Sequence, residues 1–137
     1  MKAEQLRIGN YVSRKFFNPN PKNPAYEYEN CIVKGIGFEK INVTTGLIRN
    51  EILKLNYESL KPIPLTEEWL LKFGFVNRYS NVWMKEDNER ENVFEFDDNN
   101  LYFTAEEGVN YSVAINNIHG LQNFYFALTG TELTINK

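Results

Sequence analysis

The charge of this chain changes sign at one proline-bounded junction, and that division constrains its fold more than any other feature. Residues 1–63 carry ten Lys or Arg and six Asp or Glu, a net charge of +4, whereas residues 64–137 carry five and twelve, a net charge of −7. The junction is Pro62-Ile63-Pro64-Leu65-Thr66, and proline interrupts both helices and sheet ladders. We therefore expect two structural units, 1–63 and 64–137, although a chain of 137 residues also suits one compact domain.

The first unit has the pattern of short, bent β-strands. We expect a strand at 6–12, a strand pair or one bent strand at 31–43, and a strand within 47–60, where a helix is the alternative. The segment 16–28 contains three prolines and is predicted to be an exposed loop. Strand length and glycine placement favour a small bent barrel of the Src-homology-3 type.

The second unit mixes helices with an antiparallel sheet. Thr66 is a good N-cap for a helix that ends at Gly74, and Asn117 for a second helix that ends at Gly130. Between the helices we expect four strands, at 81–85, 93–96, 101–104 and 109–115, with a polar loop at 86–92. A short final strand is expected after the second helix, at 131–135. The fold class is therefore α+β: a barrel-like unit followed by a helix, an antiparallel sheet and a C-terminal helix.

Composition narrows the classes of function. The only cysteine, Cys31, cannot form an internal disulfide and is expected to be a small buried hydrophobe. There is no apolar leader and no apolar run long enough to span a bilayer, so we expect a cytoplasmic protein with no membrane partner. No dinucleotide or phosphate loop is present, and we predict no cofactor, no metal and no catalytic residue.

Two features of the second unit have both a chemical and a structural interpretation. His119, the only histidine, is a potential general base, but its position in the first turn of a helix favours a half-exposed helical residue. A set of carboxylates could hold a divalent cation, although it lacks the central glycine of a calcium loop and suits a solvated hairpin better. That set is Glu86, Asp87, Glu89, Glu91, Glu95, Asp97 and Asp98.

The first unit brings basic and aromatic residues together in the proline-containing segment. Proteins that bind single-stranded nucleic acid stack bases on aromatic rings and hold phosphates with Lys and Arg, and exposed aromatics also anchor protein interfaces. We therefore predict an interaction loop formed by Arg14, Lys15, Phe16, Phe17, Lys22, Tyr26 and Tyr28.

Three segments resemble a family of small uncharacterised proteins from prophages and mobile elements of Bacteroides-type gut bacteria. They are LRIGNYV at 6–12, PIPLTEEWLLKFGF at 62–75 and LQNFYFALTGTELTI at 121–135. The resemblance touches both ends and the middle of the chain. It implies a cytoplasmic, accessory role and assigns no activity or site residue.

These observations favour a non-enzymatic accessory protein that acts by binding another protein. One alternative is weak binding of single-stranded nucleic acid through the same basic and aromatic residues, and another is a metal-dependent hydrolase that uses the carboxylates of 86–98. The sequence does not define the oligomeric state, although an exposed edge strand would suit a symmetric dimer.

Overall fold

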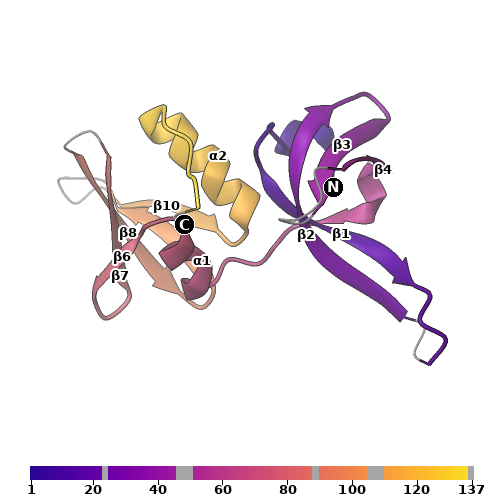
Figure 1. Ribbon diagram of the computed structural model, residues 1–137. Helices are drawn as coiled ribbons and strands as arrows, with labels where there is room; N and C mark the ends of the chain where they lie inside the picture. Colours follow the sequence, from indigo (N-terminus) through magenta and orange to yellow (C-terminus); the bar gives the residue numbers. More distant parts are fainter. Residues whose placement is uncertain (23–24, 46–50, 88–89, 105–109, 136–137) are drawn as a thin grey trace. The chain divides into compact units, whose positions relative to one another are not determined.

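The computed structural model describes residues 1–22, 25–45, 51–87, 90–104 and 110–135, which fall into two compact units (Figure 1). Unit 1 is Met1–Ile63 and unit 2 is Pro64–Lys137. The boundary lies inside the proline-containing junction where the charge changes sign. Both units contain an antiparallel sheet and unit 2 adds two α-helices, so the fold is α+β. That each unit is a separate folding domain stays a prediction.

Unit 1 is a five-stranded antiparallel sheet. Its strand order is β4-β3-β2-β1-β5, and no ladder among the described residues joins β4 to β5, so the sheet is open there. The strands are β1 (Tyr11–Asn18), β2 (Ala25–Ile36), β3 (Lys40–Thr45), β4 (Ile52–Asn56) and β5 (Leu60–Lys61). Two 3-10 turns accompany them, η1 (Ala3–Gln5) and η2 (Tyr57–Ser59).

Alternation of apolar and polar residues builds the core of unit 1. Successive side chains of a strand point to opposite faces, so every second residue of the strands can be buried. In β3, Ile41 and Val43 are fully buried, whereas Lys40 before them and Asn42 between them are exposed. The buried cluster consists of Leu6, Val12, Cys31, Val33, Ile41, Val43 and Leu60.

Two sequence-based predictions for unit 1 are confirmed and two are wrong. Residues 31–43 contain the end of β2 and most of β3, which is the strand pair of the two alternatives, and the described part of 47–60 contains strand β4. The strand expected at 6–12 begins only at Tyr11, because Gly9 has a positive φ of 96° and the preceding residues form a turn. The predicted loop at 16–28 is mostly strand: β1 and β2 pair as far as Asn18 and Ala25, so Pro19 and Pro21 lie in the hairpin tip, and Pro24 lies outside the described residues.

Unit 2 is a five-stranded antiparallel meander with a long helix. Its strand order is β10-β9-β8-β7-β6. The elements are α1 (Glu67–Lys72), β6 (Val76–Tyr79), β7 (Val82–Asp87), β8 (Arg90–Asp97), β9 (Asn100–Thr104), β10 (Asn110–Ile115) and α2 (Ile118–Thr129). No helix among the described residues is long and apolar enough to cross a membrane.

The helix ends of unit 2 are confirmed as predicted. The Thr66 hydroxyl accepts a hydrogen bond from the Trp69 amide at 3.4 Å, and the Asn117 side chain accepts one from the Gly120 amide at 2.7 Å. Each cap satisfies an amide that has no partner within its helix. Gly130 ends α2 in the left-handed conformation, with φ of 76°, where a Cβ would be unfavourable.

The sheet of unit 2 is more extensive than the sequence indicated. Of the loop predicted at 86–92, residues 86–87 belong to β7 and 90–92 to β8, where Lys85 lies opposite Asn92, and 88–89 lie outside the described residues. Strand β6 was not predicted, and the strand expected at 131–135 does not form, although Leu133 is buried. The predicted hairpin across 97–100 is confirmed, with positive φ at Asp98 and Asn99.

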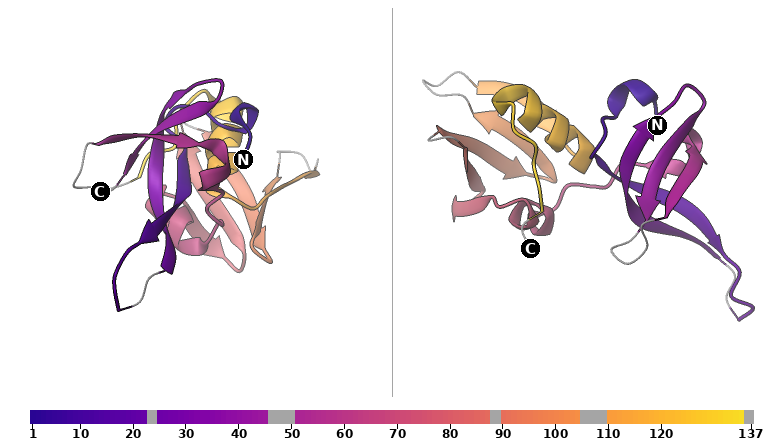
Figure 2. Two further views of the ribbon diagram at one scale, coloured as in Figure 1. Left: turned by 90° about the vertical axis from the view of Figure 1, so that its right-hand side faces the viewer. Right: turned by 45° about the horizontal axis from the view of Figure 1, so that its top comes forward.

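Helix α2 covers one face of the unit 2 sheet, as the right-hand view in Figure 2 shows. Phe124 of α2 contacts Phe94 of β8 and Phe103 of β9, with ring centroids 6.4 and 5.5 Å apart. Tyr125 of the same helix meets Phe75 edge to face. Phe75, Phe94 and Tyr125 are buried and Phe103 and Phe124 are half-buried, so these contacts form an aromatic core for unit 2.

Candidate interaction site

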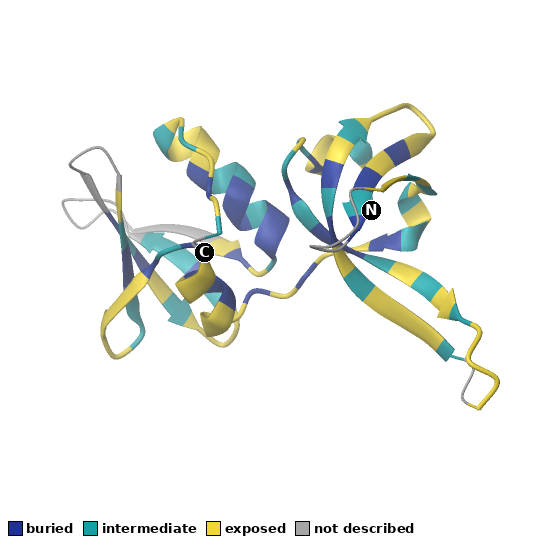
Figure 3. Ribbon diagram, viewed as in Figure 1, coloured by how far each residue is buried: buried dark blue, intermediate teal, exposed yellow. Residues whose placement is uncertain are grey.

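The outer parts of β1 and β2 form a two-stranded arm that extends beyond the rest of the unit 1 sheet (Figure 1). We define the arm as residues 14–18 of β1 and 25–29 of β2. Its side chains are exposed or half-buried, as the colouring in Figure 3 shows, in contrast to the buried base of the same strands. A two-stranded ribbon has little core of its own, so contacts between its side chains must hold it together.

One face of the arm carries aromatic rings and lysines. Residues directly opposite one another in an antiparallel pair lie on the same face. Phe17 lies opposite Tyr26 and Lys15 opposite Tyr28, while Lys61 of β5 joins the same face opposite Ser13. We call Lys15, Phe17, Tyr26, Tyr28 and Lys61 the aromatic–lysine face.

The side chains of this face contact one another. The rings of Phe17 and Tyr26 meet edge to face at 5.4 Å, and the Lys15 ammonium lies 4.3 Å from the centre of the Tyr26 ring. The Lys61 ammonium lies 4.6 Å from the Tyr28 ring centre and donates a hydrogen bond of 2.7 Å to the Tyr28 hydroxyl. That hydrogen bond lowers the pKa of Tyr28 below its usual value of 10.0.

Exposure of the rings distinguishes this face from a core. Phe17, Tyr26 and Tyr28 are 53, 65 and 47% exposed. Neither lysine of the face forms an ion pair with a carboxylate of the described residues, and no carboxylate lies on this face among the paired residues of the arm. The face therefore offers apolar contact area and unpaired positive charge together.

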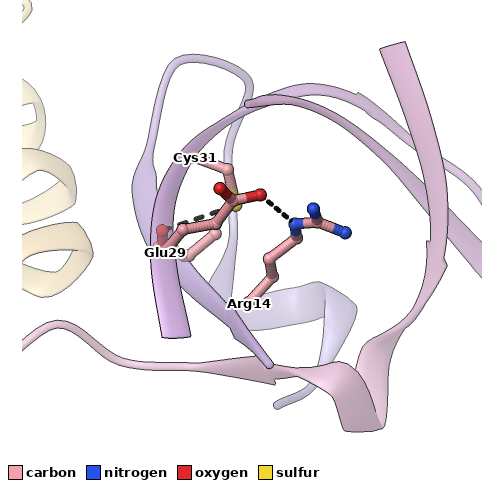
Figure 4. A network of polar contacts seen from close by, with 4 residues as sticks. Arg14, Glu29 and Cys31 are labelled. Atoms are coloured by element: carbon pink, nitrogen blue, oxygen red, sulfur yellow. Dashed lines mark hydrogen bonds and ion pairs between the residues drawn. The ribbon is translucent and has the colours of Figure 1, made fainter. Parts of the chain in front are cut away.

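The opposite face of the arm continues the core-facing side of the sheet. Arg14 and Glu29 form an ion pair there, and the Arg14 guanidinium lies 5.1 Å from the centre of the Phe16 ring. Figure 4 shows this pair beside Cys31, whose thiol donates a hydrogen bond to the Val12 carbonyl at 3.4 Å. Burial raises the pKa of Cys31 to about 12, so the thiol stays protonated and is a packing residue, as the sequence predicted.

Both edges of the arm lack a neighbouring strand in the described residues. Strand β5 pairs only with Ser13 and Arg14 of β1, and the pairing of β3 with β2 begins at Cys31. The backbone along 15–18 and along 25–30 therefore presents amide and carbonyl groups at an open sheet edge. Such an edge is able to accept an additional strand.

The structure brings together part of the predicted interaction loop. Lys15, Phe17, Tyr26 and Tyr28 share the aromatic–lysine face, whereas Arg14 and Phe16 lie on the opposite face. Lys22 is exposed at the hairpin tip. Sequence reasoning missed Lys61, because only the pairing of β5 with β1 places this residue beside the arm.

His119 is buried rather than half-exposed, which corrects the sequence-based prediction. It lies in the first turn of α2 and is 6% exposed, and its Nδ1 atom has no hydrogen-bond partner among the described residues. Burial lowers the pKa of His119, so the imidazole is neutral at pH 7.

The described carboxylates of 86–98 lie in β7, in β8 and in the turn that follows β8. Glu86, Glu95, Asp97 and Asp98 are exposed, Glu89 lies outside the described residues, and Asp87 and Glu91 are described only by their backbone pairing. Within the described part of the chain, no three Asp, Glu, His or Cys side chains are grouped to hold a metal ion. The hydrolase hypothesis therefore has no supporting geometry among these residues.

Comparison with known proteins leaves the arm as the basis for a functional argument. No family model matches the chain, and no curated protein or solved structure matches it either.

Proposed function

We propose that this chain is a non-enzymatic binding protein that uses the arm of unit 1 to contact a partner protein. The observation that carries the proposal is the aromatic–lysine face, where three rings of 47 to 65% exposure lie beside an open sheet edge. Tyrosine and other aromatic residues dominate the energetics of protein interfaces because they bury a large area at a small cost in conformational entropy.

A pull-down with a matched control tests this proposal. The tagged protein and its Phe17→Ala/Tyr26→Ala variant are incubated with lysate of the source organism, with and without nuclease. We expect a protein captured in stoichiometric amount that survives nuclease and is lost with the variant. The control is Ile52→Ala/Phe38→Ala, which removes two exposed apolar side chains of unit 1 outside the arm. Capture that the arm variant leaves unchanged would contradict the proposal.

Single-stranded nucleic acid is the second candidate partner. Lys15 and Lys61 provide positive charge next to tyrosine rings on a face without carboxylates in the paired part of the arm. Binding of this kind releases counterions and weakens steeply as salt rises. Prey that disappears on nuclease treatment, together with salt-dependent binding of an oligothymidylate, would favour this candidate over a protein.

We further propose that unit 1 is an open variant of the small Src-homology-3 type of barrel. The strand order supports this proposal, since the last strand returns to pair with the first and only β4 and β5 remain apart. Together with the resemblance of three segments to mobile-element proteins, it suggests an accessory role in the cytoplasm of a Bacteroides-type host. Fractionation of a host that expresses the tagged chain tests the location.

A further inference from the structure

We propose that the arm binds an extended acidic segment of its partner, which adds as a strand to the open edge of β1 and places carboxylates against Lys15 and Lys61. This inference rests on the proposed function, because it names the partner chemistry of the same site. It follows from the position of the open edge, from the charges beside it and from the contacts of Lys15 and Lys61 with the tyrosine rings.

The edge of β1 is the better docking edge of the two. An incoming strand on this edge would follow on from β5, which ends its pairing at Arg14, and would lie along residues 15–18. Its closest side-chain neighbours would be Lys15 and Phe17 on one face and Phe16 on the other. A strand on the edge of β2 would instead meet Glu27 and Glu29. The β1 edge therefore attracts carboxylates, and the β2 edge repels them.

The two lysines flank this edge on a single face. Lys61 lies opposite Ser13, two residues before Lys15 in β1, so the two lysines are diagonal neighbours on that face. Diagonal neighbours of adjacent strands are about 7–8 Å apart, within reach of long side chains. Because successive residues of a strand point to opposite faces, a segment with a carboxylate beside Lys15 would place its next residue beside Phe16 on the other face, where an apolar side chain fits. The expected segment therefore alternates acidic and apolar residues.

The ring contacts favour a peptide over a nucleic acid. Base stacking needs an accessible ring face, yet the Lys15 and Lys61 ammonium groups lie over the rings of Tyr26 and Tyr28. A base would have to displace these lysines, whereas a carboxylate can accept hydrogen bonds from them in place. Cation–π contact also holds each lysine in one position, which reduces the entropy lost on binding.

The test measures the binding of a fluorescein-labelled peptide of alternating glutamate and valine to the full-length protein by fluorescence anisotropy. Three other probes accompany it: the same peptide with alternate backbone nitrogens methylated, a lysine–valine peptide, and an oligothymidylate. The variants are Lys15→Glu/Lys61→Glu and, as a control with the same change in net charge, Lys34→Glu/Lys54→Glu, at exposed lysines of unit 1 outside the arm. Circular dichroism checks that each variant is folded.

We expect the glutamate–valine peptide to bind the wild type and the control variant equally. The Lys15→Glu/Lys61→Glu variant should bind at least about tenfold more weakly, since each hydrogen bond to a charged group is worth about a factor of ten or more. Methylation of the backbone should abolish binding, because it removes the donors of the added strand. Amide chemical shifts should change along 15–18 and not along 25–30.

Other results would overturn the inference. Equal binding of the methylated peptide would show charge attraction without strand addition, and binding of the oligothymidylate alone would favour nucleic acid. If no peptide binds while the tagged protein still captures a partner in an arm-dependent manner, this inference fails and the proposed function stands. If arm-dependent capture is also absent, both fail.

Discussion

Truncation of Tyr26 to alanine should loosen the arm and leave the core of unit 1 intact. Tyr26 is 65% exposed, so only about a third of its ring surface is buried by the fold. Complete burial of a ring of this size contributes about 2 kcal/mol, and a third of this is roughly 0.7 kcal/mol. The cation–π contact with Lys15 adds about 0.5 kcal/mol at an exposed site, and the edge-to-face contact with Phe17 about as much.

The expected loss of unfolding free energy is therefore about 1–2 kcal/mol. For comparison, Ile41→Ala removes a fully buried side chain of the same unit and should cost about 2–5 kcal/mol. Trp69 and Trp83 both belong to unit 2, so the unfolding of unit 1 should be followed by far-ultraviolet circular dichroism rather than by tryptophan fluorescence. Amide hydrogen exchange measures the local effect.

In Tyr26→Ala, exchange should accelerate along 15–18 and 25–29 and stay unchanged at Val33 and Val43 of the core. Ile41→Ala should accelerate exchange throughout unit 1. A stability loss in Tyr26→Ala equal to that of Ile41→Ala, with faster exchange in the core, would refute the view that the arm is a separate surface element.

Four further predictions concern the rest of the chain. Because burial raises the pKa of Cys31 to about 12, its reaction with a disulfide reagent at pH 8 should be limited by unfolding; reaction at the rate of a free thiol would contradict this. Burial lowers the pKa of His119 below 6.5, so near that pH the unfolded chain binds a proton that the folded chain does not, and the stability of unit 2 should fall as the pH drops below 6.5. Unfolding followed by tryptophan fluorescence should show that the stability of His119→Gln depends less on pH, whereas the same pH dependence in both proteins would contradict the assignment. Asn117→Ala should cost unit 2 about 1 kcal/mol, largely restored in Asn117→Asp, whereas equal losses in both variants would argue against a capping role. Fragments 1–63 and 64–137 should each unfold cooperatively when produced alone, and a fragment without a cooperative transition would show that the units depend on each other.

Local signals made the helix ends of unit 2 predictable. A capping side chain and the amide that it satisfies are three residues apart in the chain, as in Asn117 and Gly120, so the sequence contains the whole interaction. The hairpin turn at Asp98 and Asn99 is equally local, because these residue types tolerate positive φ.

The arm was harder to predict because its signals conflict. Proline density indicated a loop over 16–28, yet Pro19 and Pro21 lie beyond the end of β1, and the flanking aromatic residues continue the two strands. Cross-strand contacts such as Phe17 with Tyr26 outweigh the local preference. The sequence could identify the residues of the arm but could not divide them between its two faces before the register was known.

Contacts between distant segments explain the remaining errors. Lys61 reaches the arm only because β5 pairs with β1, across more than forty residues of sequence. His119 is buried, whereas its position near a helix start indicated exposure. Both results depend on tertiary packing, which a local pattern does not contain.

The most direct test of the central claim is photo-crosslinking inside cells that express the chain. A photoreactive phenylalanine analogue is placed at Phe17 on the aromatic–lysine face or, as a control, at Ile52, which is 65% exposed in β4 of the same unit. The account predicts a defined protein adduct from position 17, resistant to nuclease, and none from position 52. A nuclease-sensitive adduct at position 17, or protein adducts from position 52 and not from 17, would contradict it.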